Sequence, residues 1–240
     1  MRFTLALLLF STACASGDDD YQVKADDPTD SGGSAGTSST AQLQGRVCVV
    51  MDARAMTQCA TTGASGLAVS AGSVATTTAD DGTFVLDLPT AFTGQVAVSG
   101  AGVTPTFAPS AAFQKAIANN TQASVPVLNA DAYQQMVLAT GVQSTVGSGA
   151  IIASVTRGGL PVSGARITTT PAASGGPFYE GATPTGFDGV ATGQSGIAWA
   201  PGVASGGAAI NVTDGEGGET LVGGVQVVDG GLTLTEVPID

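Results

Sequence analysis

The chain has 240 residues, of which 19 are acidic and 7 are basic, giving a formal net charge of −12. The few Lys and Arg residues are spread along the sequence, and binding to a phosphate backbone needs clustered cations, so nucleic-acid binding is disfavoured and no nucleic-acid partner is expected. Histidine is absent, which removes the commonest general base and the commonest transition-metal ligand. We therefore expect a protein that is not an enzyme and that needs no cofactor.

The first fourteen residues have the order of an export signal. Arg2 precedes an apolar run from Phe3 to Phe10 that is too short to span a bilayer, and small residues lead from Ser11 to Cys14. The stretch resembles a bacterial lipoprotein signal, which implies that Cys14 is lipidated and anchors the mature chain in a membrane. Ser11 departs from that pattern because an aliphatic residue is usual at its position. Ordinary signal cleavage nearby therefore stays open.

Residues 15–41 are rich in Asp, Ser, Gly and Thr. A segment of this composition buries too little apolar surface to fold, so it is expected to be a disordered, acidic and flexible linker. Signal and linker together predict that the folded part lies outside the cytoplasm, anchored in the bacterial cell envelope at the outer membrane or the surface.

Two cysteines remain once Cys14 is assigned to the signal. Cys48 and Cys59 have ten residues between them, and an even pair in an exported protein predicts a disulfide. Closing a loop of this size restricts the unfolded chain by roughly 2–3 kcal/mol. Two buried free thiols are the alternative.

From Gln42 onwards, short runs rich in Val, Ile and Thr are separated by Gly, Asp and Pro, which is typical of strands joined by turns. We expect strands at 45–50 and 84–89, with a turn at 80–82. In the second of these runs every other residue is Phe or Leu, which predicts one buried face.

A sequence repeat links the two parts of the chain. The string GLAVSAGSVATTT at 66–78 and the string GLPVSGARITTT at 159–170 share Gly, Leu, Val, Ser and paired Thr at equivalent places. A glycine-led strand precedes each copy, at 45–50 and at 149–155. The repeat predicts two structural units of related build.

These pieces resemble known domain families. The glycine-led strand at Gly45, the Leu67–Val74 segment and the Phe84–Pro89 strand resemble the carboxypeptidase regulatory-like family. The second copy is also similar to bacterial immunoglobulin-like adhesin domains at Gly196–Trp199 and Gly207–Val212. Both resemblances imply a β-sandwich without catalytic residues. The expected fold is therefore all-β, with two tandem Ig-like or prealbumin-like sandwiches.

A helix is predicted between the two copies, from Asp131 to Val142. Asn129 or Asp131 caps its start and Gly141 ends it. The expected apolar stripe consists of Tyr133, Met136, Val137 and Ala139. The predicted parts of the chain are a signal at 1–14, the linker at 15–41, a first sandwich at 42–128, a helical connector at 129–146 and a second sandwich at 147–240.

Two groups of residues are candidate binding sites. Asp214, Glu216 and Glu219 place three carboxylates within six residues, which is a weak calcium-site pattern, and a solvated hairpin tip is the alternative. Trp199 and Tyr179 are aromatic residues that would stack on a sugar if exposed, and core anchors are the alternative.

The function predicted from the sequence is that of a non-catalytic envelope lipoprotein, acting as a structural or protein-interaction module at a bacterial surface. Its expected partners are a membrane, through the lipid anchor at Cys14, and a protein or glycan that the sequence does not identify. A carbohydrate-binding accessory module is the alternative. A hydrolase that pairs Asp80 with Glu180 has no supporting spacing in the sequence.

Overall fold

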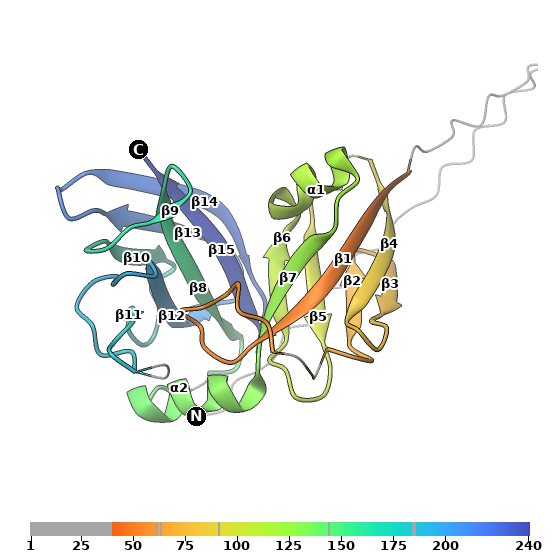
Figure 1. Ribbon diagram of the computed structural model, residues 1–240. Helices are drawn as coiled ribbons and strands as arrows, with labels where there is room; N and C mark the ends of the chain where they lie inside the picture. Colours follow the sequence, from red (N-terminus) through yellow and green to blue (C-terminus); the bar gives the residue numbers. More distant parts are fainter. Residues whose placement is uncertain (1–39, 61, 63, 91, 144, 184–185) are drawn as a thin grey trace, which may run out of the picture. The chain divides into compact units, whose positions relative to one another are not determined.

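The computed structural model describes residues 40–240 except 61, 63, 91, 144 and 184–185 (Figure 1). The export signal, Cys14 and nearly all of the predicted linker lie outside the described residues. Residues 38–240 belong to one compact unit. Among the described residues, no helix is long and apolar enough to cross a membrane.

The described chain is mostly β-strand, as predicted, with short helices between strands. The elements of residues 40–128, called the N-terminal half below, are β1 (Thr40–Val50), β2 (Ala68–Ala71), β3 (Val74–Thr77), β4 (Thr83–Pro89), β5 (Gln95–Ser99), β6 (Thr106–Pro109), the 3₁₀ helix η1 (Ser110–Phe113), α1 (Gln114–Asn119) and β7 (Ala123–Leu128). The helix α2 (Ala130–Thr140) follows. The elements of residues 148–239, called the C-terminal half, are β8 (Ser148–Arg157), β9 (Leu160–Pro161), β10 (Arg166–Thr170), β11 (Phe178–Tyr179), β12 (Ile197–Ala204), β13 (Gly206–Thr213), β14 (Glu219–Val227) and β15 (Leu232–Ile239).

One long sheet contains strands from both halves. Its order is β11-β12-β8-β15-β6-β5-β2-β3, with β9 paired to β8. The two halves join where β15 runs parallel to β6, with Leu232 opposite Thr106 and Thr233 opposite Phe107. Two three-stranded sheets, β4-β1-β7 and β10-β13-β14, complete the fold. The division into sandwiches at 42–128 and 147–240 stays a prediction, and the shared sheet is a feature that the sequence pattern did not indicate.

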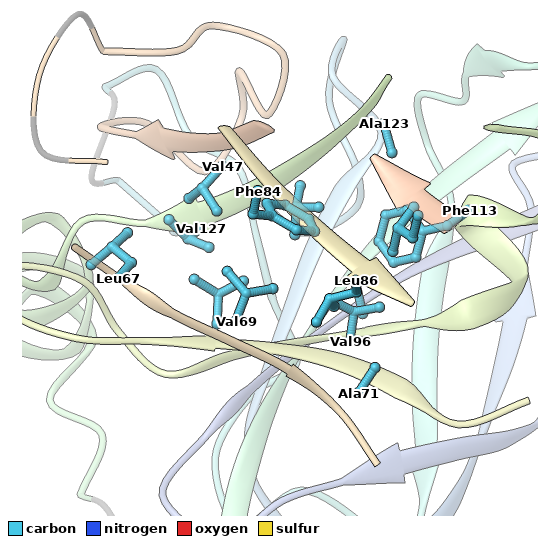
Figure 2. Packing of buried hydrophobic residues seen from close by; sticks show 14 of the residues in the cluster. Val47, Leu67, Val69, Ala71, Phe84, Leu86, Val96, Phe113, Ala123 and Val127 are labelled. Carbon is cyan, nitrogen blue, oxygen red and sulfur yellow. The ribbon is translucent and has the colours of Figure 1, made fainter. Parts of the chain in front are cut away.

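The core of the N-terminal half lies between the β4-β1-β7 sheet and strands β2, β5 and β6 of the long sheet (Figure 2). In β4, Phe84, Leu86 and Leu88 are buried while Val85 is 47% exposed, which confirms the predicted alternation. Gly45 pairs with Phe84 across β1 and β4. A side chain at position 45 would collide with the ring of Phe84, so the glycine that opens this predicted strand makes room for a core aromatic.

The core of the C-terminal half depends on a strand that is buried on both faces. Strand β8 contains an almost continuous apolar run, as expected for a strand covered on two sides. Ile151 and Val155 pack toward the β10-β13-β14 sheet in one cluster, whereas Ala150 and Ile152 point to the opposite face and join a different cluster. The second cluster connects the two halves.

This bridging cluster takes residues from both halves and from the helix between them. Val50 and Leu128 come from the ends of β1 and β7, Met136 comes from α2, and Trp199 and Leu232 come from the C-terminal half. Because these side chains are almost completely buried, the two halves share a hydrophobic core as well as a sheet.

Helix α2 confirms the helix predicted from Asp131 to Val142. The observed helix begins one residue earlier, at Ala130, and ends two residues earlier, at Thr140. The Oδ1 of Asn129 accepts hydrogen bonds from the backbone N–H groups of Asp131 and Ala132, at 3.0 and 3.1 Å, and Gly141 ends the helix at φ 68°. The predicted apolar stripe is wrong at Ala139, which is exposed. Ala132, one turn before Met136, is buried in its place. That the helix acts as a connector between two separate domains stays a prediction.

The two copies of the sequence repeat pair differently. In the first copy, β2 and β3 form a hairpin at the end of the long sheet. In the second copy, β9 pairs with β8 in the long sheet, whereas β10 pairs with β13 in a separate sheet. Similar strings of residues therefore occupy different positions in the sheets of the two halves.

Candidate interaction surface

The predicted disulfide is present between Cys48 and Cys59, with a Cα–Cα distance of 4.8 Å. Cys48 lies near the end of β1 and is buried, whereas Cys59 is exposed. Backbone bonding between Val50 and Cys59 closes the same loop, residues 51–58. The crosslink thus holds a surface loop against the end of β1, next to the bridging cluster.

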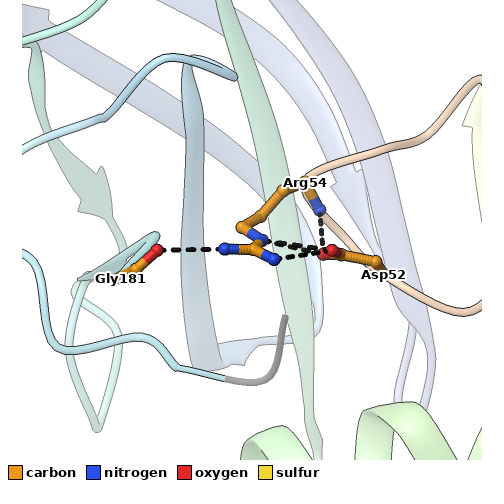
Figure 3. Close-up of polar contacts among 3 residues, drawn as sticks. All are labelled: Asp52, Arg54 and Gly181. Carbon is orange, nitrogen blue, oxygen red and sulfur yellow. Dashed lines mark hydrogen bonds and ion pairs between the residues drawn. The ribbon is translucent and has the colours of Figure 1, made fainter. Parts of the chain in front are cut away.

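Arg54 in this disulfide-closed loop reaches across to the C-terminal half (Figure 3). Its Nη2 lies 2.8 Å from the Oδ2 of Asp52, and its Nη1 donates a 3.1 Å hydrogen bond to the carbonyl oxygen of Gly181. Burial acts to raise the pKa of Asp52, but hydrogen bonds and the charge of Arg54 outweigh it, so the pKa falls below its usual value. The hydrogen bonds that Arg54 donates to the carboxylate of Asp52 raise the pKa of Arg54 in turn.

The segment that Arg54 contacts is itself fixed by an acidic side chain. Glu180 is 9% exposed, and its Oε1 accepts a 2.9 Å hydrogen bond from the backbone N–H of Ser195. The positive charge of Arg54 also interacts with Glu180. These contacts make the junction of the two halves polar at its rim and apolar in its centre.

The centre of the junction is an aromatic cluster around Trp199. The centroid of the Trp199 ring lies 5.6 Å from those of Phe178 and Phe187 and 5.9 Å from that of Tyr133. Trp199 is fully buried, and burial raises the pKa of the Tyr133 hydroxyl. Such packing is typical of a core anchor.

The predicted sugar-binding pair is not exposed in the structure. Tyr179 is 6% exposed; its hydroxyl accepts a 2.9 Å hydrogen bond from the N–H of Ile167 and donates a 3.3 Å bond to the carbonyl of the same residue. Burial raises the pKa of Tyr179. Since Trp199 is also enclosed, neither ring offers a free face to a sugar, and the structure favours the alternative of two core residues.

The predicted calcium ligands lie at the tip of the β13–β14 hairpin. The carboxylate of Asp214 accepts hydrogen bonds from the N–H groups of Gly218 and Glu216, at 2.7 and 2.9 Å, and pairs with Arg157 at 2.6 Å. The bond from Gly218 is the main reason that the pKa of Asp214 falls below its usual value. Within the described ranges, no group of three or more His, Cys, Asp or Glu side chains is placed to hold a metal ion. The carboxylate of Asp214 shapes the turn, while Glu216 and Glu219 are exposed.

A cleft of about 850 Å³ lies where β5 and η1 of the N-terminal half face β14 and β15 of the C-terminal half. Its lining is mainly small and apolar, with amide and hydroxyl groups between. Gln95 crosses it, because its Nε2 donates a 3.0 Å hydrogen bond to the carbonyl of Gln226. The Oγ1 of Thr233 donates to the same carbonyl at 2.8 Å.

Sequence reasoning assigned none of the cleft residues to a site. The signal that was present in the sequence is the pair Gly223-Gly224 inside an apolar strand, because glycines within a strand often mark a bulge or a close approach. The register of β13 and β14 shifts at this point, between Ala208 and Ile210. The cleft itself depends on the long-range pairing of β15 with β6, which the pattern did not indicate.

Comparisons with known proteins identify no family for the chain. No family model matches it, and no curated protein matches it. The carboxypeptidase regulatory-like resemblance therefore stays a prediction.

Solved structures give weak likenesses. A double mutant of the shaft pilin SpaA from Lactobacillus rhamnosus GG aligns at a TM-score of 0.24 and 12% identity, covering 84% of this chain and 98% of that one. The minor pilin GBS52 from Streptococcus agalactiae aligns at 0.25 and 12%, covering 83% and 94%. The Bacillus anthracis TIE protein aligns at 0.21 and 13%, covering 83% and 34%. Scores of this size carry no argument about function.

Proposed function

We propose that the chain is a non-catalytic structural or protein-interaction module of the bacterial cell envelope, anchored through a lipid on Cys14. The observation that carries this proposal is the Cys48–Cys59 disulfide, which closes a partly exposed loop. Disulfides of this kind persist in oxidising compartments outside the cytoplasm. The export-signal pattern before Cys14 supports the same location independently.

Several acidic side chains of the described residues hold the structure together, which supports a role without catalysis. The chain contains no histidine. The buried or half-buried carboxylates at the junction, Asp52 and Glu180, form bonds that hold loops in place. The carboxylate of Asp214 shapes a turn. A fold in which these acidic groups have structural partners suits binding better than chemistry.

The anchor is tested by replacing the proposed lipidated residue in the full-length chain. Cys14→Ala removes the thiol that would carry the lipid, and we expect the protein to move from the membrane fraction to the soluble fraction of the envelope. Metabolic labelling with a fatty-acid analogue should mark the wild type and leave the variant unmarked.

Two further variants control this experiment. Ser11→Leu restores the aliphatic residue usual in lipoprotein signals and should increase the labelled fraction. Cys59→Ser removes a different cysteine and should leave both labelling and membrane association unchanged. Unchanged fractionation of Cys14→Ala would refute the lipid anchor, and a wild-type chain found in the cytoplasm would refute the proposed location.

A further inference from the structure

Strand β14 is the edge of its sheet. The order β10-β13-β14 gives it a partner on one side, and no described strand pairs with it on the other. An unpaired strand edge presents backbone donors and acceptors that another extended chain can use. A strand edge that lies beside a cleft is a place where an extended segment of another chain can add as a further strand.

The outer edge of β14 already accepts hydrogen bonds from side chains. The carbonyl of Gln226 receives one from Gln95 Nε2 at 3.0 Å and one from Thr233 Oγ1 at 2.8 Å, both from residues outside the β10-β13-β14 sheet. This carbonyl therefore points into the cleft rather than toward β13.

The middle of β14 is open to the cleft because it carries no side chains there. Gly223 and Gly224 line the cleft and are exposed, and a Cβ added at either would meet nothing within 4 Å. On either side, Val222 and Val225 supply apolar lining. A strand lying along this stretch would have the backbone of β14 at close range and a mainly small, apolar lining around it.

Charge selects among the chains that would fit. Glu236 is the one charged side chain among the described residues that line the cleft, and it is exposed. The whole protein carries a net charge of −12. An acidic segment would be repelled, whereas a neutral segment with a Lys or Arg opposite Glu236 would be attracted.

We propose that this cleft binds an extended, non-acidic segment of another protein, which adds as a strand to the free edge of β14 with a basic side chain beside Glu236. The inference rests on the proposed function, because it names the kind of partner that the interaction module takes. Main-chain hydrogen bonds supply affinity in this mode, and the cleft lining with Glu236 supplies selectivity.

The test uses the purified mature chain and a fluorescent, end-capped peptide probe of about ten residues, in which threonine and valine alternate around a central lysine. Fluorescence anisotropy should show saturable binding, and hydrogen exchange should slow at residues 222–226. A probe with glutamate in place of lysine should bind about threefold more weakly. A probe N-methylated at alternate residues should bind at least tenfold more weakly than the lysine probe, since its backbone cannot donate the hydrogen bonds between strands.

Variants of the protein locate the binding site. Gly223→Trp fills open space in the cleft and should weaken binding of the lysine probe at least tenfold, an effect expected from steric exclusion of the strand. Leu221→Trp is the matched control, because Leu221 is 71% exposed on the same strand and does not line the cleft. Glu236→Gln should reduce the difference between the lysine and glutamate probes, and the net charge of the rest of the protein accounts for what remains. Circular dichroism and the melting temperature confirm that each variant is folded.

Three results would overturn the inference. These are the absence of saturable probe binding, equal binding by Gly223→Trp and Leu221→Trp, and a concentration-dependent dimer that Gly223→Trp abolishes, which would identify a second copy as the occupant. None of them concerns where the protein is located, so the proposed function would still stand. Conversely, a cytoplasmic wild type would remove the proposed function without changing the binding result.

Discussion

Trp199 illustrates how one side chain decides the character of the junction between the halves. It is fully buried among aromatic rings contributed by α2 and by the segment around Phe187. Among the described residues, its indole Nε1 has no hydrogen-bond partner. A buried donor without a partner costs about 1–3 kcal/mol, so the residue stabilises the core by its size rather than by its polar atom.

Two substitutions of Trp199 should therefore differ in their effect on stability. Trp199→Phe removes the unpaired donor, which stabilises the fold, and also removes some buried volume, which destabilises it. Because the two effects oppose each other, the free energy of unfolding should change by no more than about 1 kcal/mol. Trp199→Ala should lower the free energy of unfolding by about 3–5 kcal/mol because it leaves a large cavity. Urea unfolding followed by circular dichroism measures both. Equal losses in the two variants would show that the indole N–H contributes to stability.

At the scale of elements, helix α2 depends on its first residue. Asn129 caps the helix through Oδ1, and its Nδ2 donates a 3.2 Å hydrogen bond to the carbonyl of Gly102. The same side chain thus satisfies the start of the helix and ties it to the N-terminal half. Met136, two turns further along, carries the helix into the bridging cluster.

Asn129→Ala should therefore lower the free energy of unfolding by about 1 kcal/mol, the usual loss for an N-cap. Asn129→Asp keeps an acceptor for the helix but loses the donor to Gly102. It should therefore lower the free energy of unfolding by less than Asn129→Ala does. Gln134→Ala, on the exposed face of the same helix, should change stability by less than about 0.5 kcal/mol. Thermal unfolding of the three variants gives the comparison, and an Asn129→Ala variant as stable as Gln134→Ala would contradict the capping argument.

At the scale of the whole described molecule, several features join the halves. They include the β15–β6 pairing, the bridging cluster, the contact of Arg54 with Gly181 and the hydrogen bond between Gln95 and Gln226. The first two are apolar or backbone interactions and do not depend on pH. The third depends on Asp52, whose ionised carboxylate orients Arg54 through hydrogen bonds of 2.8 to 3.2 Å.

The pKa of Asp52 is lowered in the folded protein, so its contribution to stability is complete above the pKa of the unfolded chain, about 3.9, and is lost as the pH falls through the folded value. Arg54→Met should therefore lower the free energy of unfolding by about 1 kcal/mol at pH 7, a modest amount because the ion pair is partly exposed. The loss should be smaller at pH 3. Arg166→Met is the control. Its Nε donates to the carbonyl of Val190 within the C-terminal half, so its effect should not vary with pH. Urea unfolding at both pH values checks this, and an equal cost of Arg54→Met at pH 7 and pH 3 would contradict the role of Asp52.

Local features of this protein followed from the sequence. The strand at 84–89, the helix capped by Asn129 and the disulfide were predictable, because alternation, capping and cysteine number act over a few residues. The burial of Trp199 and Tyr179 remained open, because an aromatic residue in a strand suits a core and an exposed face equally. The cleft could not be predicted, since its two walls come from residues more than a hundred positions apart.

The sequence by itself determined the β-rich character, the turns, the capped helix and the cysteine pair, and it predicts export of the chain. Only the tertiary structure decided that β15 pairs with β6 in one shared sheet, that a third core lies between the halves and that no described strand pairs with the outer edge of β14. The physical reason is that strand pairing between distant segments depends on which edges and apolar faces remain free once each half has folded. No local pattern of residues encodes that choice.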